Sequence, residues 1–317
     1  NRGLVARNRP QSRSRVRSVK DWIKLSAKGF AMGAADLVPG VSGGTIAFIS
    51  GIYDELISTI AGLGMGTLRD LFRGGPIEVW KKYNLSFLAV LVLGLMFAVL
   101  TLAGPIHWIQ IHHPSELRAF FFGLVLASAP LIVREIRPYK RADFKWGILG
   151  IVLALILTNL TPGFQSEAPV FIAICGAFAI CAMLLPGISG SFILVILGAY
   201  NSIISALANF DILRIGAFCL GAFIGLLSFS RMLKKILHNF RAQTLAILTG
   251  FMLGSLHVLW PWKEQITLLF THRDGREEYL LGNILPDFQP LEIICMIAFA
   301  AMGVCVVMGL DQLSKTK

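Results

Sequence analysis

The sequence predicts an all-α integral membrane protein that consists of two repeats of inverted topology. Three observations lead to this prediction. Hydrophobic residues make up 55% of the chain and charged residues 15%, whereas about 25% of residues in soluble domains are charged. The segment ADLVPGVSGGT at 35–45 returns as AMLLPGISGSF at 182–192 without a gap. Lysine and arginine are concentrated in some loops and lacking in others. Each repeat is expected to contain a helical hairpin broken at Pro-Gly and three transmembrane helices.

Residues 1–20 are expected to form a basic cytoplasmic tail ahead of the first repeat. Six arginines and one lysine precede the first acidic residue, Asp21. An arm that binds nucleic acid has a similar charge. Ahead of a membrane domain, however, such a tail is more typical of a segment that is attracted to anionic lipid and fixes the orientation of the chain. We therefore expect no nucleic-acid partner.

The first repeat is expected to cover residues 21–165. A helix at 21–38 is expected to end at Pro39-Gly40, because proline and glycine interrupt helices. Ser42 is suited to cap a second helix at 43–63, since its hydroxyl can accept a bond from the first turn. Three apolar spans follow at 85–104, 118–134 and 145–160.

The second repeat is expected to cover residues 166–317 and to follow the same plan. A helix at 169–185 ends at Pro186-Gly187, and a further helix follows at 190–208. The remaining spans are expected at 212–230, 242–260 and 292–310. All five cysteines lie in these apolar segments without metal-type spacing, so that neither disulfides nor a metal or other cofactor is expected.

The distribution of lysine and arginine predicts which side of the membrane each loop occupies. These residues are frequent at 69–82, 134–145 and 231–241, and they are lacking at 105–117 and 158–169. The positive-inside rule then places both termini of a multi-pass protein in the cytoplasm. It also predicts that the first hairpin enters from the cytoplasm and the second from outside. Whether the hairpins are re-entrant or fully spanning stays open, and so does the oligomeric state.

The broken segments carry the chemistry expected of an anion site. A half-helix that begins at membrane depth presents unpaired N–H groups and a positive dipole end. Small residues let an anion approach the backbone, and hydroxyls add hydrogen-bond donors. The alternative is that the small residues only allow helices to pack closely. The candidate phosphate-binding residues are Ser42, Gly43, Gly44, Thr45, Ser189, Gly190 and Ser191.

Two charged residues are further candidates. Asp36 adjoins the first break, and its repeat partner is Met183. A carboxylate within a membrane is costly, which makes Asp36 a candidate for a coupling proton or a cation, or else a cap or hydrogen-bond partner for the second break. Arg118 begins a span on the outer side, where it is suited either to catch a lipid phosphate or to reach the interface as a snorkelling arginine.

Three segments of the chain resemble a bacterial family. They are residues 35–45, the following Gly51-Ile52-Tyr53, and the repeated motif Pro186-Gly187-Ile188-Ser189-Gly190-Ser191. This family, formerly a domain of unknown function, is described as polyprenyl-phosphate transporters. The resemblance runs from about residue 20 to the end. It implies a flippase in the bacterial plasma membrane that returns undecaprenyl phosphate from the outer to the inner leaflet for peptidoglycan and other envelope polymers. It also implies that Ser42, Gly43, Gly44, Ser189 and Gly190 hold the head group.

Two other classes of function stay open at this point. A transporter of small inorganic anions would use the same dipole site with a closed pore. A membrane-embedded enzyme acting on lipid phosphates would need a nucleophile or metal ligands. The sequence has no Walker loop and no Pro-Ser-Gly-His element of acid-phosphatase type. We therefore expect a transporter and not an enzyme.

Overall fold

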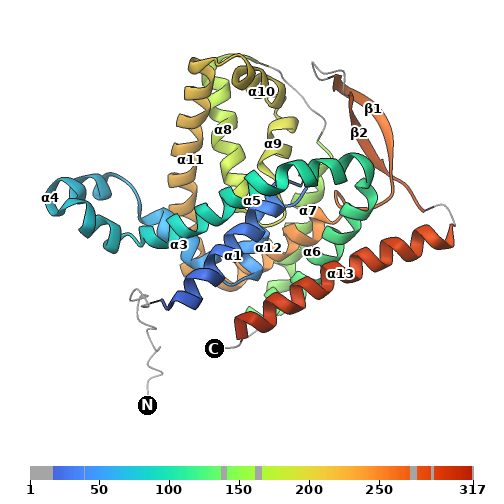
Figure 1. Ribbon diagram of the computed structural model, residues 1–317, viewed down its shortest axis with the longest axis horizontal. Helices are drawn as coiled ribbons and strands as arrows, with labels where there is room; N and C mark the ends of the chain where they lie inside the picture. The colour runs from blue at the N-terminus through green and yellow to red at the C-terminus, as the bar shows by residue number, and fades with distance from the viewer. Residues whose placement is uncertain are drawn as a thin grey trace.

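The computed structural model describes residues 17–38, 40–136, 141–160, 166–271, 277–286 and 289–315. These residues form thirteen helices and one two-stranded sheet (Figure 1). Most of the predicted basic tail and the predicted helix breaker Pro39 lie outside the described residues. Within them, four helices are long and apolar enough to cross a membrane, or five if one bent pair is counted as a span. The predicted all-α membrane architecture is confirmed at this level.

The first hairpin has one more bend than the sequence predicted. The expected helix at 43–63 was wrong, because the chain turns at Gly51, whose φ of +71° lies in the left-handed region that favours glycine. A capping box of Ser18 and Asp21 begins the helix that precedes this hairpin. The elements are α1 (Val19–Asp36), α2 (Gly43–Ile49) and α3 (Tyr53–Gly62).

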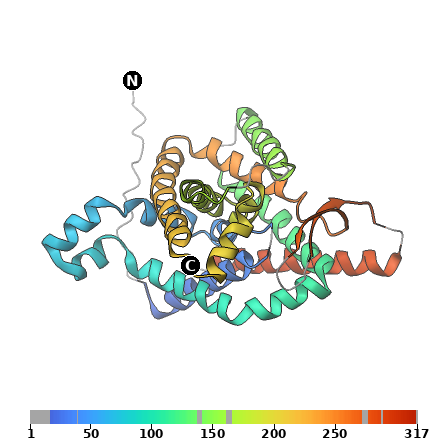
Figure 2. The ribbon, with the colours of Figure 1, turned by 90° about the horizontal axis from the view of Figure 1, so that it is seen from above.

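The segment expected to be a basic loop at 69–82 is instead helical. It forms α4 (Met65–Lys82), which bends at Gly75 (φ +78°) ahead of Pro76. Figures 1 and 2 both show α4 extending away from the body of the molecule, opposite the β-hairpin. The next three helices agree with the predicted spans, although the first of them continues past residue 104. They are α5 (Leu85–His112), α6 (Pro114–Glu135) and α7 (Arg141–Thr158).

The second half repeats the bend. The expected helix at 190–208 was wrong, because two short helices meet at 109° next to Gly198, whose φ is +69°. Gly51 and Gly198 are equivalent positions of the repeated motif. An antiparallel β-hairpin, with Lys263 opposite Asn283, occupies the segment for which the sequence predicted only a loop. The elements are α8 (Pro169–Leu184), α9 (Gly190–Ile196), α10 (Tyr200–Ala208), α11 (Ile212–Asn239), α12 (Arg241–Ser255), β1 (Lys263–Thr271), β2 (Glu277–Asn283) and α13 (Pro290–Lys315).

Within each half, the first helix packs on the first long helix after the hairpin. In the first half, α1 packs on α5, and Gly94 lies against the carbonyl of Ser26. In the second half, α8 packs on α11, and Gly221 lies against the carbonyl of Ala173. A Cβ at either glycine would collide with the backbone of the other helix, so these glycines allow the close crossing.

The last helix of each half packs on a helix of the other half. Gly303 of α13 lies against the carbonyl of Phe120 in α6, and Gly150 of α7 lies against the carbonyl of Ile247 in α12. Phe120 and Ile247 are aligned positions of the two halves. The halves are therefore interlocked and not merely side by side.

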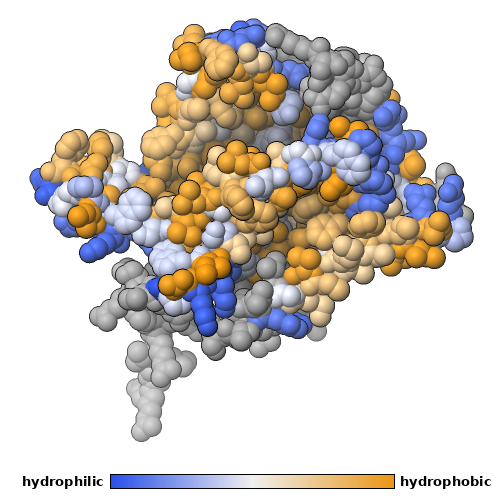
Figure 3. Space-filling model, viewed as in Figure 1, coloured by the Kyte–Doolittle hydropathy of each residue, from blue (hydrophilic) through white to orange (hydrophobic). Residues whose placement is uncertain are grey.

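The outer surface of the long helices is apolar. Leu93, Phe97 and Leu100 of α5 are 68%, 61% and 77% exposed. Figure 3 shows hydrophobic residues over much of this face. Exposed side chains of this kind suit contact with lipid acyl chains, whereas a water-soluble surface rarely carries such patches.

Candidate functional site

The two Pro-Gly segments meet in the interior of the molecule. Thr45 Oγ1 accepts a hydrogen bond of 3.0 Å from the backbone N–H of Gly187. Ser42 Oγ lies 3.2 Å from the carbonyl oxygen of Met183, to which it donates. Ser42 and Thr45 are 1% and 0% exposed. Two motifs far apart in the sequence thus form one polar centre, which we call the paired tips: residues 40–45 and 186–191.

Glycine makes the turn at both tips. Gly40 has a φ of +84° and Gly187 a φ of +90°. In this left-handed region a side chain would be strained, so glycine is the residue of lowest cost. Pro186 is fully buried next to its glycine. The helices α1 and α8 end before these turns, at Asp36 and Leu184.

The N-terminus of α2 is already occupied by groups of the protein. Gly43 donates its N–H to Asp36 Oδ1 at 2.6 Å, and Gly44 donates its N–H to Ser42 Oγ at 3.1 Å. Asp36 was expected to carry a coupling ion or to bond the second break. The structure places its carboxylate on the first break, where a negative group stabilises the positive end of the half-helix.

The N-terminus of α9 has a different environment. Met183, the repeat partner of Asp36, lies against Gly190, where a Cβ would meet its side chain. Ser189 makes no side-chain capping bond in α9, and its hydroxyl instead lies 2.7 Å from that of Ser191. Ser189 is buried, whereas Ser191 is exposed. This tip therefore presents two adjacent hydroxyls at a helix start without a carboxylate cap.

Tyr53 belongs to the same centre, although it was not among the predicted site residues. Its hydroxyl donates to the carbonyl oxygen of Leu184 at 2.8 Å, and its ring packs on Phe48. Tyr53 is 3% exposed. The bond ties the start of α3 to the end of α8. The matching Tyr53 and Tyr200 of the two motifs were the signal that could have pointed to it.

Arg118 donates hydrogen bonds to residues outside the paired tips. Its guanidinium donates to the carbonyl oxygen of Pro261 at 3.1 Å and to Ser115 Oγ at 3.3 Å. Lys263 in β1 is close enough for the two positive charges to repel. Burial and, second, the charge of Arg118 lower the pKa of Lys263 to about 8. Its ammonium donates to Asn283 Oδ1 at 2.6 Å. Lys263 was not among the predicted site residues, because it lies far from Arg118 along the chain.

Comparison with known proteins identifies the family. A family model described as "undecaprenyl phosphate translocase-like" matches residues 32–276. The chain belongs to this family. It is 39% identical to a polyprenyl-phosphate transporter of Vibrio cholerae over 298 residues, which cover 92% of this chain and 97% of that protein. It is 31% identical to a polyprenyl-phosphate transporter of Staphylococcus aureus over 262 residues, which cover 76% of this chain and 86% of that protein. No solved structure matches the chain.

These relatives confirm the family resemblance predicted from the sequence. Both are named as transporters, in agreement with the expectation that this protein is not an enzyme. The apolar helices and the family together support a multi-pass membrane protein.

Proposed function

We propose that this protein is a flippase that returns undecaprenyl phosphate from the outer to the inner leaflet of the bacterial plasma membrane. The released carrier lipid would serve again in the synthesis of peptidoglycan and other envelope polymers. The names of the relatives support the substrate class. The observation that carries the proposal for the site is the hydrogen bond between Thr45 and Gly187, because it brings two half-helix starts into one buried centre.

The phosphate is proposed to bind at the paired tips, with the start of α9 as its first contact. Ser189, Gly190 and Ser191 offer hydroxyls and backbone N–H groups, which suit a phosphate at a helix N-terminus. At the other tip, Asp36 already accepts from Gly43. Two anions cannot share that N–H, so Ser42, Gly43, Gly44 and Thr45 would take part only after the carboxylate of Asp36 moves away.

We propose that the two halves are inverted repeats that alternate in exposing this centre. The matched contacts of Gly150 with Ile247 and of Gly303 with Phe120 support this arrangement. Interlocked halves can rock about a shared centre, as in other transporters built from inverted repeats. Both termini would lie in the cytoplasm, in agreement with the positive-inside rule.

The polyprenyl chain is proposed to stay in the lipid while only the phosphate crosses. The exposed apolar faces of α5, α11 and α13 suit such contact. Arg118 and Lys263 are proposed to attract the phosphate on the outer side before it reaches the paired tips, because two nearby cations favour a doubly charged anion.

Transport in proteoliposomes tests the proposal. Labelled undecaprenyl phosphate would be placed in the outer leaflet, and its loss from that leaflet would be followed by access to an added phosphatase. The protein is expected to speed this loss compared with empty vesicles and with a Ser189→Ala/Ser191→Ala variant. Equal rates in the three samples would refute the proposal.

A further inference from the structure

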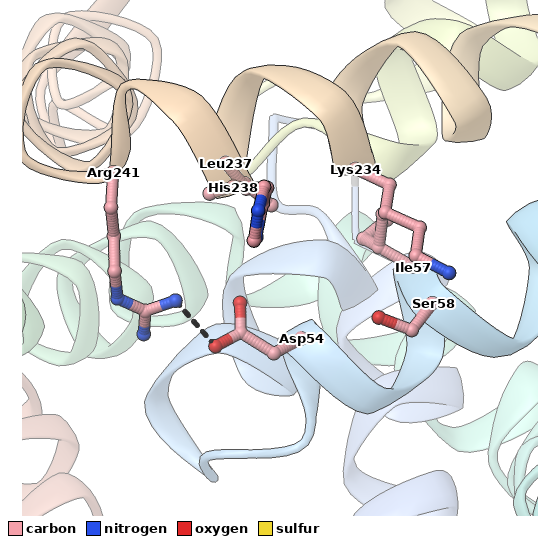
Figure 4. Close-up of a pocket in the computed structure, with 7 residues that line it drawn as sticks. All are labelled: Asp54, Ile57, Ser58, Lys234, Leu237, His238 and Arg241. Atoms are coloured by element: carbon pink, nitrogen blue, oxygen red, sulfur yellow. Dashed lines mark hydrogen bonds and ion pairs between the residues drawn. The ribbon is translucent and has the colours of Figure 1, made fainter. Parts of the chain in front are cut away.

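A charged cavity lies between α3 and the junction of α11 and α12, and its described lining residues differ from those of the paired tips. Its volume is about 320 Å³. Figure 4 shows three basic side chains that project from α11 and α12 toward α3. The lining residues are Asp54, Ile57, Ser58, Lys234, Leu237, His238 and Arg241. We call it the basic cavity.

The basic groups lie on one side of the cavity because of helical periodicity. Lys234 and His238 are four residues apart on α11, so they lie one above the other on the same face. Arg241 follows at the start of α12 and lies beside His238 in Figure 4. An ammonium and a guanidinium thus face the same space, with an imidazole between them.

Among the described residues that line the cavity, one carboxylate, that of Asp54, opposes these groups. Arg241 Nη1 lies 2.7 Å from Asp54 Oδ2, and the two side chains are 48% and 52% exposed. An ion pair this exposed contributes little to stability, so an incoming anion can compete for the arginine. A phosphate can accept two parallel hydrogen bonds from a guanidinium and a further one from a nearby ammonium. With Lys234 and Arg241 against Asp54, the described lining residues carry a net positive charge.

The rest of the lining is amphiphilic. Ile57 and Leu237 are 1% and 6% exposed and form an apolar wall, whereas Ser58 adds a hydroxyl from α3. A wall of this kind beside cations suits a phosphate monoester that carries an apolar group. It equally leaves room for free phosphate.

We propose that the basic cavity binds a phosphate monoester or free phosphate, held by Lys234 and Arg241, with Asp54 as the group that the anion displaces. Binding of phosphate in this cavity does not depend on the transport activity proposed above. A second role, release of the lipid phosphate from the protein at this place, rests on that activity. The cavity lies in the basic segment 231–241, which the positive-inside rule places on the cytoplasmic side.

Binding to the full-length protein in nanodiscs tests this inference. Inorganic phosphate and farnesyl phosphate would be titrated separately by calorimetry. Lys234→Ala/Arg241→Ala is expected to weaken binding of at least one of them by roughly tenfold or more, because two charged hydrogen bonds are lost. Lys235→Ala, an exposed neighbour on the same helix that does not line the cavity, is the matched control and is expected to bind as the parent protein does.

Asp54→Asn supplies a test in the opposite direction. Removing the competing carboxylate is expected to tighten phosphate binding severalfold. If the cavity does not bind phosphate, the affinity measured for Asp54→Asn would equal that of the parent protein. All variants alter exposed side chains, and unchanged thermal melting would show that they are folded.

The outcomes separate this inference from the proposed function. Loss of inorganic phosphate binding alone would identify free phosphate as the ligand, and loss of farnesyl phosphate binding alone would identify a lipid head group. If neither affinity changes in Lys234→Ala/Arg241→Ala, the basic cavity is no phosphate site, even where transport proceeds. If Lys234→Ala/Arg241→Ala loses binding but the parent protein moves no lipid in proteoliposomes, the phosphate site is supported and the proposed function fails.

Discussion

Thr45 and Gly187 are 142 residues apart and are joined by a 3.0 Å hydrogen bond in the centre of the molecule. Thr45 is fully buried, and its hydroxyl satisfies a backbone N–H that has little access to water. The bond connects the start of α2 to the turn ahead of α9. A structural change at either tip therefore alters the other tip. A site shared between two halves requires such a connection.

Thr45→Val is expected to destabilise the protein by about 1–3 kcal/mol, because it leaves the buried N–H of Gly187 unpaired while it keeps the side-chain volume. Thr45→Ser keeps the hydroxyl and serves as the control. Thermal unfolding in detergent would measure both. If Thr45→Val melts at the same temperature as the parent protein, the bond contributes nothing to the link between the tips.

The two tips are expected to differ in their contribution to phosphate binding. Ser189→Ala/Ser191→Ala should weaken the affinity for farnesyl phosphate more than Ser42→Ala, because Ser42 Oγ is engaged with Met183 and Gly44. Titration of the purified variants would measure the difference. A larger loss in Ser42→Ala would place the first contact at α2 instead of α9.

Asp36→Asn tests whether the carboxylate at Gly43 couples transport to protons. The amide oxygen can still accept the bond from Gly43, so the tip should keep its structure, but the side chain can no longer gain or lose a proton. The expected result is transport with a flattened dependence on pH. Transport by Asp36→Asn with the parent's pH profile would remove proton coupling at this residue.

The crossing of α6 and α13 is expected to tolerate no side chain at Gly303. Gly303→Ala would push a methyl group into the carbonyl of Phe120, at a cost of about 1–3 kcal/mol. Gly309 lies on the same helix with nothing within 4 Å of an added Cβ, so that Gly309→Ala is the matched control. Melting temperatures would compare the two. Equal temperatures would mean that the helices do not cross this closely.

The β-hairpin is expected to respond to alkaline pH through Lys263. Its pKa is lowered to about 8 in the folded protein, from an ordinary value of 10.5. Between these values the unfolded chain binds more protons than the folded one, so this residue makes stability rise with pH from about 8 to 10.5. Lys263→Gln should remove that part of the rise. The check is the difference in unfolding free energy between parent and variant across this window.

Much of the architecture was predictable because it depends on local pattern. Apolar runs predicted the spans that became α5 to α8 and α11 to α13, and the repeated motif predicted where α1 and α8 end. The bends at Gly51 and Gly198 were missed, because an isolated glycine can also continue a helix at modest cost. The helix α4 was missed because its basic residues favoured a loop, and the β-hairpin because its segment showed no clear alternation.

The sequence by itself determined the membrane class, the family and the repeated Pro-Gly motif, since these follow from composition and from residue identity at fixed spacing. Only the tertiary structure decided that the two motifs touch, and that they are unequal. Asp36 bonds Gly43, whereas Met183 lies against Gly190. It also brought Asp54 to Arg241 across 187 residues. The physical reason is that the packing of helices brings a carboxylate next to a residue far along the chain. No local sequence pattern specifies this packing.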